Sequence, residues 1–438
     1  MRPIVTKFGG SSLADAGQFK KVRDIVKLDS RRLFVVPSAP GRRFDGDDKV
    51  TDLLYKCHSL NAAGEDFKWV FDIIRERYGE IARELSLTVD IGKYLDEVEK
   101  NIAAGASSDY CASRGEYLNG LLMADFLGYT FVDPQNGIFF GADGRLDEEK
   151  TNEVLGELLS KVESAVVPGF YGCGFDGKVK TFSRGGSDIT GAIVARAVNA
   201  EVYENWTDVS GFLMADPRIV GDARSISHIT YREMYELSCA GATVLHEDSV
   251  FPVSRAGIST NIRNTNMPEH PGTMISCTAV NRKDFAIFAG IAGKKGFSII
   301  LAEKDKPDNS QDLVVGTLEA IKKSGIHFDY MPSGVNNVSL LVETGEFYLG
   351  SDKFYGEMEK IKVPHYISVH DNIALIVLVG YGVIHNRETI FRIYEILRKN
   401  NIDIYMLNQG SSELSTWVGV NESHLNEAIQ AIYSEFTK

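Results

Sequence analysis

The segment Lys7-Phe8-Gly9-Gly10-Ser11-Ser12 follows the apolar stretch Ile4–Thr6 and directly precedes a run with helical spacing. A strand that carries a lysine, two glycines and two serines to the start of a helix has the composition of a polyphosphate-binding turn. Its glycines let backbone N–H groups approach an anion, the helix start adds positive potential, and Lys7 supplies a mobile charge. The glycine spacing of a Walker loop and the catalytic-loop pattern of protein kinases are absent from the sequence. The segment alone fits a phosphate site and a plain tight turn equally well.

Residues 1 to about 280 alternate short apolar runs with helical patterns. This alternation is typical of an α/β sandwich with a mainly parallel sheet. The expected buried strands are 33–36, 129–132, 166–167 and 201–203, and the expected helices include 13–27, 66–85 and 95–104.

The pattern changes after Arg282, where strand-like and helix-like segments follow in the order βαββαβ, which is then repeated. Two ferredoxin-like units in tandem fit this order. The strand 285–291 fits the second unit better, so we expect the first unit to be an insertion. The expected domains are 1–280, then 296–370 for the inserted unit, and 284–295 with 371–438 for the second unit. Further expected strands in this region are 297–301, 326–328, 367–369 and 375–379.

The bulk composition limits the classes of function. A chain of 438 residues has room for roughly two to four domains. Its formal net charge of −13 argues against a nucleic-acid partner or an acidic-membrane surface. The sequence shows no signal-peptide pattern and no long uncharged apolar run, so a cytoplasmic location is the default expectation. The five cysteines form no Cys-x-x-Cys pair, which predicts reduced thiols and no zinc site. The acidic stretch 45–48 lacks the fuller calcium-loop pattern and is expected to be a solvated loop.

Glu116 lies off the apolar stripe of a helical run, one turn before Gly120, whose missing side chain leaves room for a ligand. A carboxylate in that place suits a substrate ammonium group. The alternative is a solvated helix glutamate, which the pattern alone favours.

The segment Ser183 to Asp188 is a second glycine turn between a strand and a helix. Arg184 offers a fork for a carboxylate or phosphate, Ser187 is placed to cap the helix, and Asp188 falls in its first turn. The alternative is an N-cap turn with a surface arginine. Two such turns in one sheet favour a shared anion site at the carboxyl ends of the strands.

Two segments after the strand 201–205 also combine charge with turn residues. Thr207 to Gly211 and Asp216 to Arg218 supply carboxylates and an arginine that suit a nucleotide's ribose or phosphates. Ordinary turn chemistry explains the same residues, since Ser-Gly and Asp-Pro are common breakers.

Taken together, these segments resemble the aspartate kinases of the amino acid kinase family over nearly the whole chain. The resemblance rests on segments that follow one another in the family's order: Lys7 to Ser12, Ser38 to Gly41, Thr51 to Leu54, Gly115-Glu116, Ser183 to Asp188, Thr207 to Arg218, Ala240 to His246, Thr260 to Thr265 and, in the family's paired ACT regulatory domains, Asn408 to Glu413.

The resemblance implies transfer of the γ-phosphate of ATP to the side-chain carboxylate of aspartate, the first step of lysine, threonine and methionine synthesis. It places Lys7 and Asp188 at the transferring phosphate, and Mg²⁺ arrives with ATP, without an assigned protein ligand. Thr243 and Leu213 stand where some relatives place a lysine and a tyrosine, so those nucleotide contacts are not carried over. By position, aspartate is implied to bind Ser38, Thr51, Glu116, Arg184 and Ser187, and ATP to bind Lys7, Gly9, Gly10, Thr207, Asp208 and Arg218.

The ACT-like units imply feedback inhibition by lysine or threonine, with lysine as the expected effector, and a homodimer or tetramer formed through these units. The implied effector site comprises Asn309, Ser310, His327, Phe328 and Asp329. Two alternatives stay open: a catalytically silent amino-acid-sensing protein, and a kinase acting on glutamate or acetylglutamate. An acetylated substrate has no ammonium group for Glu116, and a silent sensor has no need of Lys7, Glu116, Arg184 and Asp188 together.

Overall fold

The structure, a computed structural model, describes residues 2–183, 185–241, 250–278, 288–306, 311–332, 334, 336–362, 365–386, 388–409 and 414–437. The chain divides into two compact units. The first comprises Met1–Phe212, Ser225–Ser238 and Thr243–Arg282, and the second Leu213–Arg224, Cys239–Ala242 and Lys283–Lys438.

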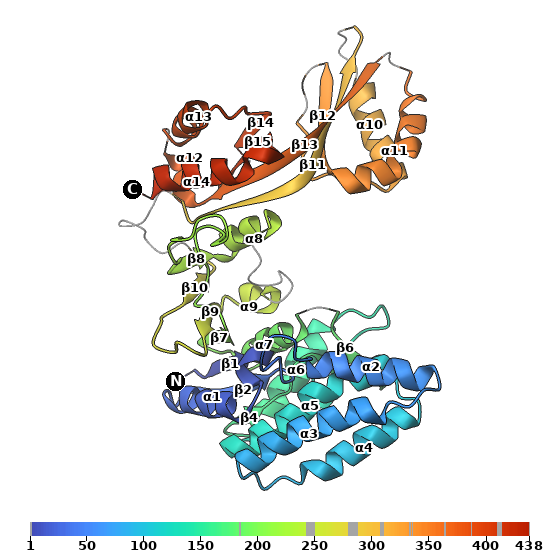
Figure 1. Ribbon diagram of the computed structural model, residues 1–438, viewed down its shortest axis with the longest axis vertical. Helices are drawn as coiled ribbons and strands as arrows, with labels where there is room; N and C mark the ends of the chain where they lie inside the picture. The colour runs from blue at the N-terminus through green and yellow to red at the C-terminus, as the bar shows by residue number, and fades with distance from the viewer. Residues whose placement is uncertain are drawn as a thin grey trace. The chain divides into compact units, whose positions relative to one another are not determined.

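In the part of the chain that is described, the first unit is built on an eight-stranded sheet (Figure 1). The central strand β1 (Ile4–Phe8) pairs in parallel with β2 (Arg32–Pro37) and with β7 (Val202–Thr207). Most other pairs are also parallel, and the exception is β9 against β10. The predicted α/β class with a mainly parallel sheet is therefore confirmed. The remaining strands, in the sheet order β3-β4-β2-β1-β7-β9-β10-β8, are β3 (Thr130–Phe131), β4 (Ala165–Val166), β9 (Ser259–Asn264), β10 (Thr273–Ser276) and β8 (His228–Thr230).

Helices pack on this sheet because alternate strand residues point to opposite faces. On one face Phe8 stacks with Trp206 at 6.0 Å and joins a buried cluster that includes Phe19 and Phe71. On the other face Lys7 points toward α7. The helices of this unit are α1 (Ala16–Lys27), α2 (Val50–Ala62), α3 (Lys68–Glu84), α4 (Ile91–Ala103), α5 (Ser108–Leu127), α6 (Glu148–Ser160), α7 (Gly186–Ala197), α8 (Tyr231–Cys239) and α9 (Phe251–Arg255).

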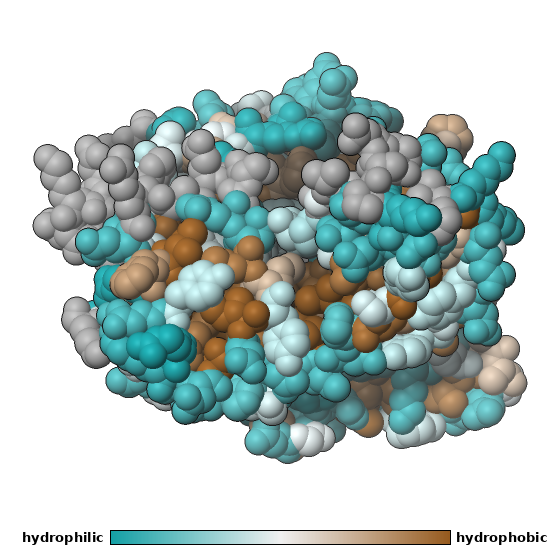
Figure 2. All heavy atoms as spheres, turned by 90° about the horizontal axis from the view of Figure 1, so that it is seen from above, coloured by the Kyte–Doolittle hydropathy of each residue, from teal (hydrophilic) through white to brown (hydrophobic). Residues whose placement is uncertain are grey.

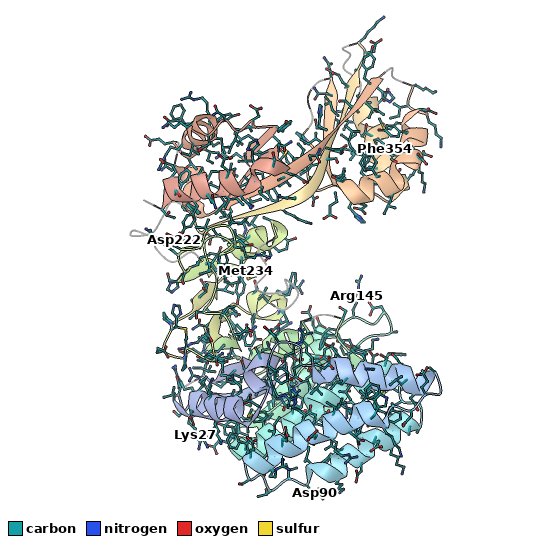
Figure 3. All side chains as sticks on the ribbon, in the orientation of Figure 1. Lys27, Asp90, Arg145, Asp222, Met234 and Phe354 are labelled. Atoms are coloured by element: carbon teal, nitrogen blue, oxygen red, sulfur yellow. The ribbon has the colours of Figure 1, made fainter. Side chains whose placement is uncertain are left out.

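Local signals set where these helices begin. The carboxylate of Asp15 caps α1 by accepting from the N–H of Gln18 at 2.9 Å. Asp90, which is labelled in Figure 3, caps α4 in the same way by accepting from the N–H of Lys93. Ser12 does not cap α1: it lies in a short 3-10 helix, η1 (Gly10–Leu13), and its hydroxyl bonds to that of Thr265 at 2.7 Å. A hairpin of β5 (Tyr171–Cys173) and β6 (Val179–Thr181), preceded by the 3-10 helix η2 (Pro134–Asn136), leads into the turn before α7.

Within the described residues, the second unit has a five-stranded sheet in the order β12-β11-β13-β15-β14. Two strands of 15 residues, β11 (Gly290–Lys304) and β13 (His365–Val379), run antiparallel along its centre. The other strands are β12 (Asn337–Glu343), β14 (Met406–Gln409) and β15 (Ser415–Asn421), and the helices are α10 (Asp312–Ser324), α11 (Thr344–Met358), α12 (Tyr381–His385), α13 (Thr389–Lys399), α14 (Leu425–Phe436) and the 3-10 helix η4 (Glu422–His424).

The long strands correct two expectations. The segments 367–369 and 375–379 belong to one strand, as do 297–301 and the described end of 285–291, of which 285–287 lie outside the described residues. The register of β11 against β13 shifts between Lys294 and Ile299, so an irregularity absorbs the break that the sequence pattern shows. The expected strand 326–328 is irregular, and pairing is limited there to a bridge between Tyr330 and Leu341.

Apolar residues occupy both faces of the second sheet. One face packs on α10 and α11 through a buried cluster that contains Phe347 and Phe354 (Figure 3). A separate cluster joins Phe297, Leu341 and Ile373 to the partly buried ring of Trp417. Apolar side chains also reach the molecular surface, where Figure 2 shows them gathered in a band among hydrophilic residues.

None of the described helices combines the length and the apolar character needed to cross a membrane. Among the described residues, no three His, Cys, Asp or Glu side chains converge as metal ligands would.

Candidate active site

Lys7, Asp188 and Asn205 form a triangle of polar contacts at the carboxyl end of the parallel strands. The Lys7 ammonium lies 2.6 Å from Asp188 Oδ1 and donates to Asn205 Oδ1 at 3.3 Å. Asn205 Nδ2 donates to the same Asp188 oxygen at 2.8 Å. Lys7 and Asn205 are opposite each other in the register of β1 and β7, and Asp188 comes from the first turn of α7. Lys7 and Asp188 were predicted from their turns, whereas Asn205 was missed because an amide within a strand has no sequence signature.

The backbone of the turn after β1 is hydrogen-bonded to neighbouring segments of the protein. The N–H of Gly9 donates to the carbonyl of Trp206 at 3.0 Å, so this donor is paired within the protein. A Cβ at Gly9 would lie 3.6 Å from the Lys7 ammonium, an ordinary van der Waals distance. Gly10 faces the loop 38–41, whose Gly41 N–H donates to the Gly10 carbonyl at 2.8 Å.

The loop 38–41 is held between two glycines that come from different elements. A Cβ on Gly10 would lie 3.0 Å from the carbonyl oxygen of Ala39, and one on Gly115 would lie 2.8 Å from the Ala39 methyl. Ser38 is fixed by its N–H, which donates to the Phe8 carbonyl at 3.0 Å. Close backbone packing therefore joins the turn after β1 to the helix that carries Glu116.

Gly41→Ala tests this packing. A Cβ at Gly41 would meet the Gly10 carbonyl carbon at 2.6 Å and the Ser11 nitrogen at 2.8 Å, both of which are backbone atoms. We expect the variant to unfold more easily by about 1–3 kcal/mol and to need more ATP. Gly79→Ala is the control, because a Cβ in that part of α3 meets nothing within 4 Å. The control should gain about 0.5–1 kcal/mol. Thermal unfolding and the KM for ATP measure both variants, and an unchanged Gly41→Ala protein would contradict the packing argument.

The loop 38–41 leads into the acidic stretch 45–48, where Asp45, Gly46 and Asp48 are exposed, as expected for a solvated loop, but Asp47 is not. Asp47 pairs with Arg77 at 2.7 Å and with Arg43 at 3.0 Å, and Arg77 donates to the Gly41 carbonyl at 3.0 Å. The hydrogen bonds from Arg43 and the positive charge of Arg77 hold the pKa of Asp47 well below its usual value. The ion pairs thus anchor the far end of the loop.

Glu116 is buried in α5, with 5% of its surface exposed, so the alternative of a solvated helix glutamate is excluded. Its Oε2 has no hydrogen-bond partner within the described part of the chain. Burial raises the pKa of Glu116 to about 8, although a backbone hydrogen bond at Ala39 and the charge of Arg114 oppose the shift. An unpartnered buried carboxyl group needs a cation to stabilise its charged form.

The surroundings of Glu116 differ from expectation at Gly120, and Asn119 adds a contact that was not expected. The space beside Gly120 is filled rather than open, because a Cβ there would lie 2.5 Å from Pro168 Cγ. Asn119, which the sequence analysis did not single out, donates to the carbonyl of Ser38 at 2.6 Å. Thr51 lies in the first turn of α2, whose Val50 N–H donates to the Pro40 carbonyl at 3.3 Å.

The turn before α7 adopts a left-handed conformation at Gly185, where φ is 57°. Gly185 is the N-cap and no side chain caps this helix, so the predicted cap at Ser187 is wrong. Ser187 instead packs against Gly169, where a Cβ would lie 2.5 Å from the serine hydroxyl. Arg184, the predicted clamp for a carboxylate, lies outside the described residues.

The predicted nucleotide residues are distributed over both units. In the first unit, Thr207 ends β7 and its hydroxyl donates to Asp208 Oδ1 at 3.1 Å. Asn264 donates to the Asp208 carbonyl at 3.2 Å and so fixes the chain there. Arg218 belongs to the second unit, where it pairs with Asp216 at 2.6 Å and its side chain is 86% exposed. Leu213 is in the second unit as well, and Thr243 lies outside the described residues.

Part of the predicted effector site can be described. His327 Nδ1 lies 2.6 Å from a carboxylate oxygen of Glu346, and this hydrogen bond raises the pKa of His327. Phe328 is 41% exposed, and the N–H of Asp329 donates to the Leu341 carbonyl at 2.9 Å. Partial desolvation raises the pKa of the Asp329 carboxyl group. Asn309 and Ser310 lie outside the described residues.

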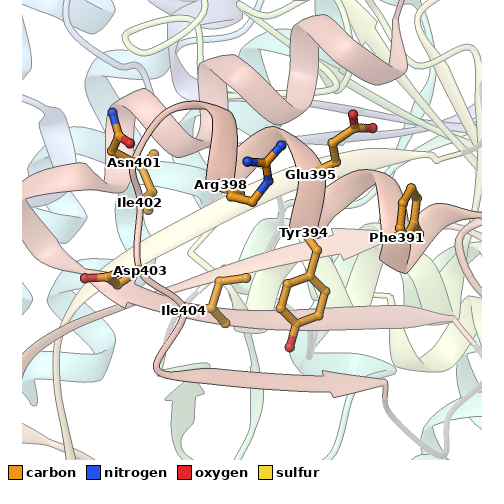
Figure 4. Close-up of a pocket in the computed structure, with 8 residues that line it drawn as sticks. All are labelled: Phe391, Tyr394, Glu395, Arg398, Asn401, Ile402, Asp403 and Ile404. Carbon is orange, nitrogen blue, oxygen red and sulfur yellow. The ribbon is translucent and has the colours of Figure 1, made fainter.

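A hollow of about 630 Å³ opens elsewhere in the second unit, along α13 and the segment that follows it (Figure 4). None of the expected effector residues lines it. Its lining residues are Phe391, Tyr394, Glu395, Arg398, Asn401, Ile402, Asp403 and Ile404.

Comparison with known proteins agrees with this architecture. Residues 2–264 match the model of the amino acid kinase family, and residues 376–436 match a model of the ACT domain. Aspartokinase 3 of Bacillus subtilis is 35% identical over 99% of this chain and 98% of its own length. The crystal structure of Clostridium acetobutylicum aspartate kinase has a TM-score of 0.92 and 47% identity, covering 99% of this chain and all of that one.

The family model matches more than half of the length of the chain. Together with the parallel sheet and the Lys7 turn at its centre, this match places the chain in the amino acid kinase family. The two full-length relatives described above are both aspartokinases. The fold is also that of Escherichia coli aspartokinase III in complex with aspartate and ADP, with a TM-score of 0.73 at 23% identity.

Proposed function

We propose that the protein transfers the γ-phosphate of ATP to the β-carboxylate of L-aspartate. The observation that carries this proposal is the ion pair of the buried Lys7 with Asp188 beside a glycine turn, joined through the loop 38–41 to the buried carboxyl of Glu116. The end with Lys7 suits a phosphate, and the end with Glu116 suits an ammonium group. The full-length similarity to aspartokinases supports the same reaction.

Phosphoryl transfer to a carboxylate requires the protein mainly to position the two substrates. A carboxylate is already ionised and nucleophilic at neutral pH, so no general base is needed. The barrier comes from bringing two anions in line, which requires fixed positive charge and hydrogen-bond donors. Lys7 would neutralise charge on the transferring phosphate, and Asp188 would hold that ammonium in place. Mg²⁺ enters as part of the Mg-ATP substrate.

The substrate contacts extend this proposal. Glu116 would bind the ammonium group of aspartate and Arg184 its α-carboxylate, while Ser38, Thr51 and Ser187 would line the same pocket. Thr207 ends the strand next to β1 and Asp208 follows it. Both would contact the nucleotide, together with Arg218 and the glycine turn.

Trapping of the acyl phosphate with hydroxylamine tests the proposed reaction. Purified protein with Mg-ATP is expected to form aspartyl hydroxamate, and to form much less product with glutamate or acetylglutamate. A preference for glutamate or acetylglutamate would identify a different kinase of the family. No hydroxamate from any of the three would favour a silent amino-acid sensor.

We further propose regulation by an amino acid bound to the ACT region, with lysine as the effector. The domain boundaries 296–370 for an inserted ACT unit and 284–295 with 371–438 for the second are part of this proposal. The complex of E. coli aspartokinase III with lysine and aspartate supports it by analogy of fold. Exposed aromatic rings of the second unit, such as Tyr366, suit contact with a second copy of the chain in a homodimer or tetramer. An effector that binds one arrangement better shifts the population toward it.

Asp329→Asn tests the effector site. A carboxylate at this position suits the ammonium group of lysine, so the variant is expected to need at least about 10-fold more lysine for half inhibition. Its KM for aspartate without lysine should not change. Asp352→Asn, on an exposed position of α11, is the matched control. Titration with lysine and threonine, separately and together, identifies the effector, and equal lysine inhibition of both variants would remove Asp329 from the site.

A further inference from the structure

Asn205 contacts both members of the ion pair at the candidate phosphate site, and nothing in the family resemblance assigns it a role. We propose that Asn205 is a positioning residue for phosphoryl transfer: its amide fixes the Lys7 ammonium relative to the Asp188 carboxylate. This inference rests on the proposed function, because it concerns the same site.

The amide uses both of its ends. Nδ2 donates to Asp188 Oδ1 at 2.8 Å, and Oδ1 accepts from the Lys7 ammonium at 3.3 Å. The opposite orientation of the amide would set its NH₂ group against an ammonium, donor against donor, so the contacts themselves fix the orientation. Asn205 is 3% exposed, which excludes bulk water as a substitute for these bonds. Only a side chain with a donor and an acceptor satisfies both neighbours at once.

The strand beneath the amide is clamped from the opposite face of the sheet. Arg32 donates to both carboxylate oxygens of Glu204, at 2.9 and 3.0 Å, and the indole N–H of Trp206 donates to Glu204 at 2.9 Å. Arg263 lies 3.6 Å from the same carboxylate and 4.5 Å from the centre of the Trp206 ring. Residues 204 and 206 flank Asn205, so this cluster holds the backbone of β7 where the amide projects toward the site.

A second contact from β7 fixes the other side of the triangle. The hydroxyl of Tyr203 donates to the backbone carbonyl of Asp188 at 3.1 Å. Tyr203 and Asn205 share a face of the strand, so one element sets both the backbone and the side chain of Asp188.

Charge explains why a neutral amide suits this position. Within the described residues, the charged groups that face Asn205 are Lys7 from β1 and Asp188 from α7, and its register partner in β9 is the apolar Ile262. Glu204 and Arg263 lie on the opposite face. The Lys7–Asp188 pair is neutral as a whole. A carboxylate in place of the amide would make the site net negative and oppose the arrival of ATP phosphates.

Three variants test the proposal: Asn205→Asp, Asn205→Ala and, as a control, Asn199→Asp, which makes the same amide-to-carboxyl change at an exposed position before β7. Hydroxamate formation gives kcat and KM for Mg-ATP between about pH 5.5 and 9, spanning the ordinary carboxyl and histidine pKa range. At pH 8 we expect Asn205→Asp to lose about 10²-fold in kcat/KM for Mg-ATP.

The pH profile separates positioning from a merely structural role. A protonated carboxyl group is neutral and has both a donor and an acceptor, so Asn205→Asp should recover relative to wild type as the pH falls. Asn205→Ala should show its loss at every pH, and Asn199→Asp should match wild type throughout. Asn205→Asp within threefold of wild type at every pH, or with a loss that does not depend on pH, would overturn the proposal.

Failure of the proposed function has a different signature: in that case neither wild type nor Asn199→Asp forms aspartyl hydroxamate. In that case the dissociation constant of Mg-ATP, measured by calorimetry over the same pH range, gives the same comparison. If Asn205→Ala does not fold, the pH dependence of Asn205→Asp alone decides.

Discussion

Lys7→Met is expected to lower kcat by about 10³-fold or more, the scale seen when a preorganised charge at a transferring phosphate is removed. Lys7 is the cation that faces Asp188 at 2.6 Å, and its side chain is only 9% exposed. Methionine keeps the length of the side chain and removes the charge. The KM for aspartate should change far less than kcat, because the substrate ammonium is assigned to Glu116.

The control for this change is Lys20→Met, which removes a lysine charge from an exposed position of α1. Its kcat should equal that of wild type. Initial rates of hydroxamate formation measure both variants, and thermal unfolding checks that Lys7→Met is folded. A Lys7→Met enzyme with a kcat within tenfold of wild type would contradict the role of Lys7.

Glu116→Gln is expected to raise the KM for aspartate by about 10²-fold, since it removes the charge from a buried site for an ammonium group. The structural reason is that Glu116 is 5% exposed and its Oε2 has no partner among the described residues. The KM for Mg-ATP should stay close to that of wild type. Glu97→Gln, on an exposed position of α4, is the matched control.

The pH dependence of aspartate binding follows from the same group. The pKa of Glu116 is raised to about 8 in the folded protein, so at neutral pH the carboxyl is mainly protonated before substrate binds. Binding of an ammonium group requires the ionised form, and the affinity for aspartate should therefore increase as the pH rises toward 8. Glu116→Gln should lack this increase. If the affinity of wild type for aspartate does not change between pH 6 and 8, Glu116 does not bind the ammonium group in this way.

The stability effect of Glu116 has the opposite sign. Its folded pKa of about 8 lies above the ordinary value of 4.5, so the folded state binds the proton more tightly than the unfolded state. The stability of the free protein should therefore fall as the pH rises between these two values. Glu116→Gln, which is neutral throughout, should lose less stability over the same interval, as thermal unfolding at several pH values will measure.

The sequence predicted the parts of the site that have a pattern. A glycine turn between a strand and a helix is visible in the residues themselves, and it located Lys7 and Asp188 in two separate turns. Parallel strands bring such turns to one edge of a sheet, and the structure shows Lys7 and Asp188 in contact. Helical periodicity likewise located Glu116, although it could not tell a buried position from a solvated one.

The features that were missed depend on contacts between distant segments. Asn205 and Asn119 are amides without a recurring spacing, and their partners come from other elements. Pro168 fills the space beside Gly120, and no local pattern in α5 indicates this contact. The N–H of Gly9 is taken by Trp206, a residue of the neighbouring strand.

The second unit shows the same limit at the level of the fold. The break in the apolar pattern near Gly296, whose φ is 94°, suggested two strands, whereas the register shift between Lys294 and Ile299 lets one strand continue. Such an irregularity is set by the pairing of β11 with β13, so local sequence does not distinguish it from a turn.

Transfer of labelled oxygen tests whether the β-carboxylate of aspartate attacks the γ-phosphorus of ATP. L-aspartate carrying ¹⁸O in its β-carboxylate is incubated with the protein, Mg-ATP and hydroxylamine, and the released phosphate is examined by mass spectrometry. If a carboxylate oxygen attacks the γ-phosphorus, that oxygen becomes the bridge of the acyl phosphate and leaves with phosphorus when hydroxylamine attacks the carbonyl carbon. We expect one ¹⁸O atom in each phosphate released together with aspartyl hydroxamate. Phosphate without ¹⁸O would contradict this attack.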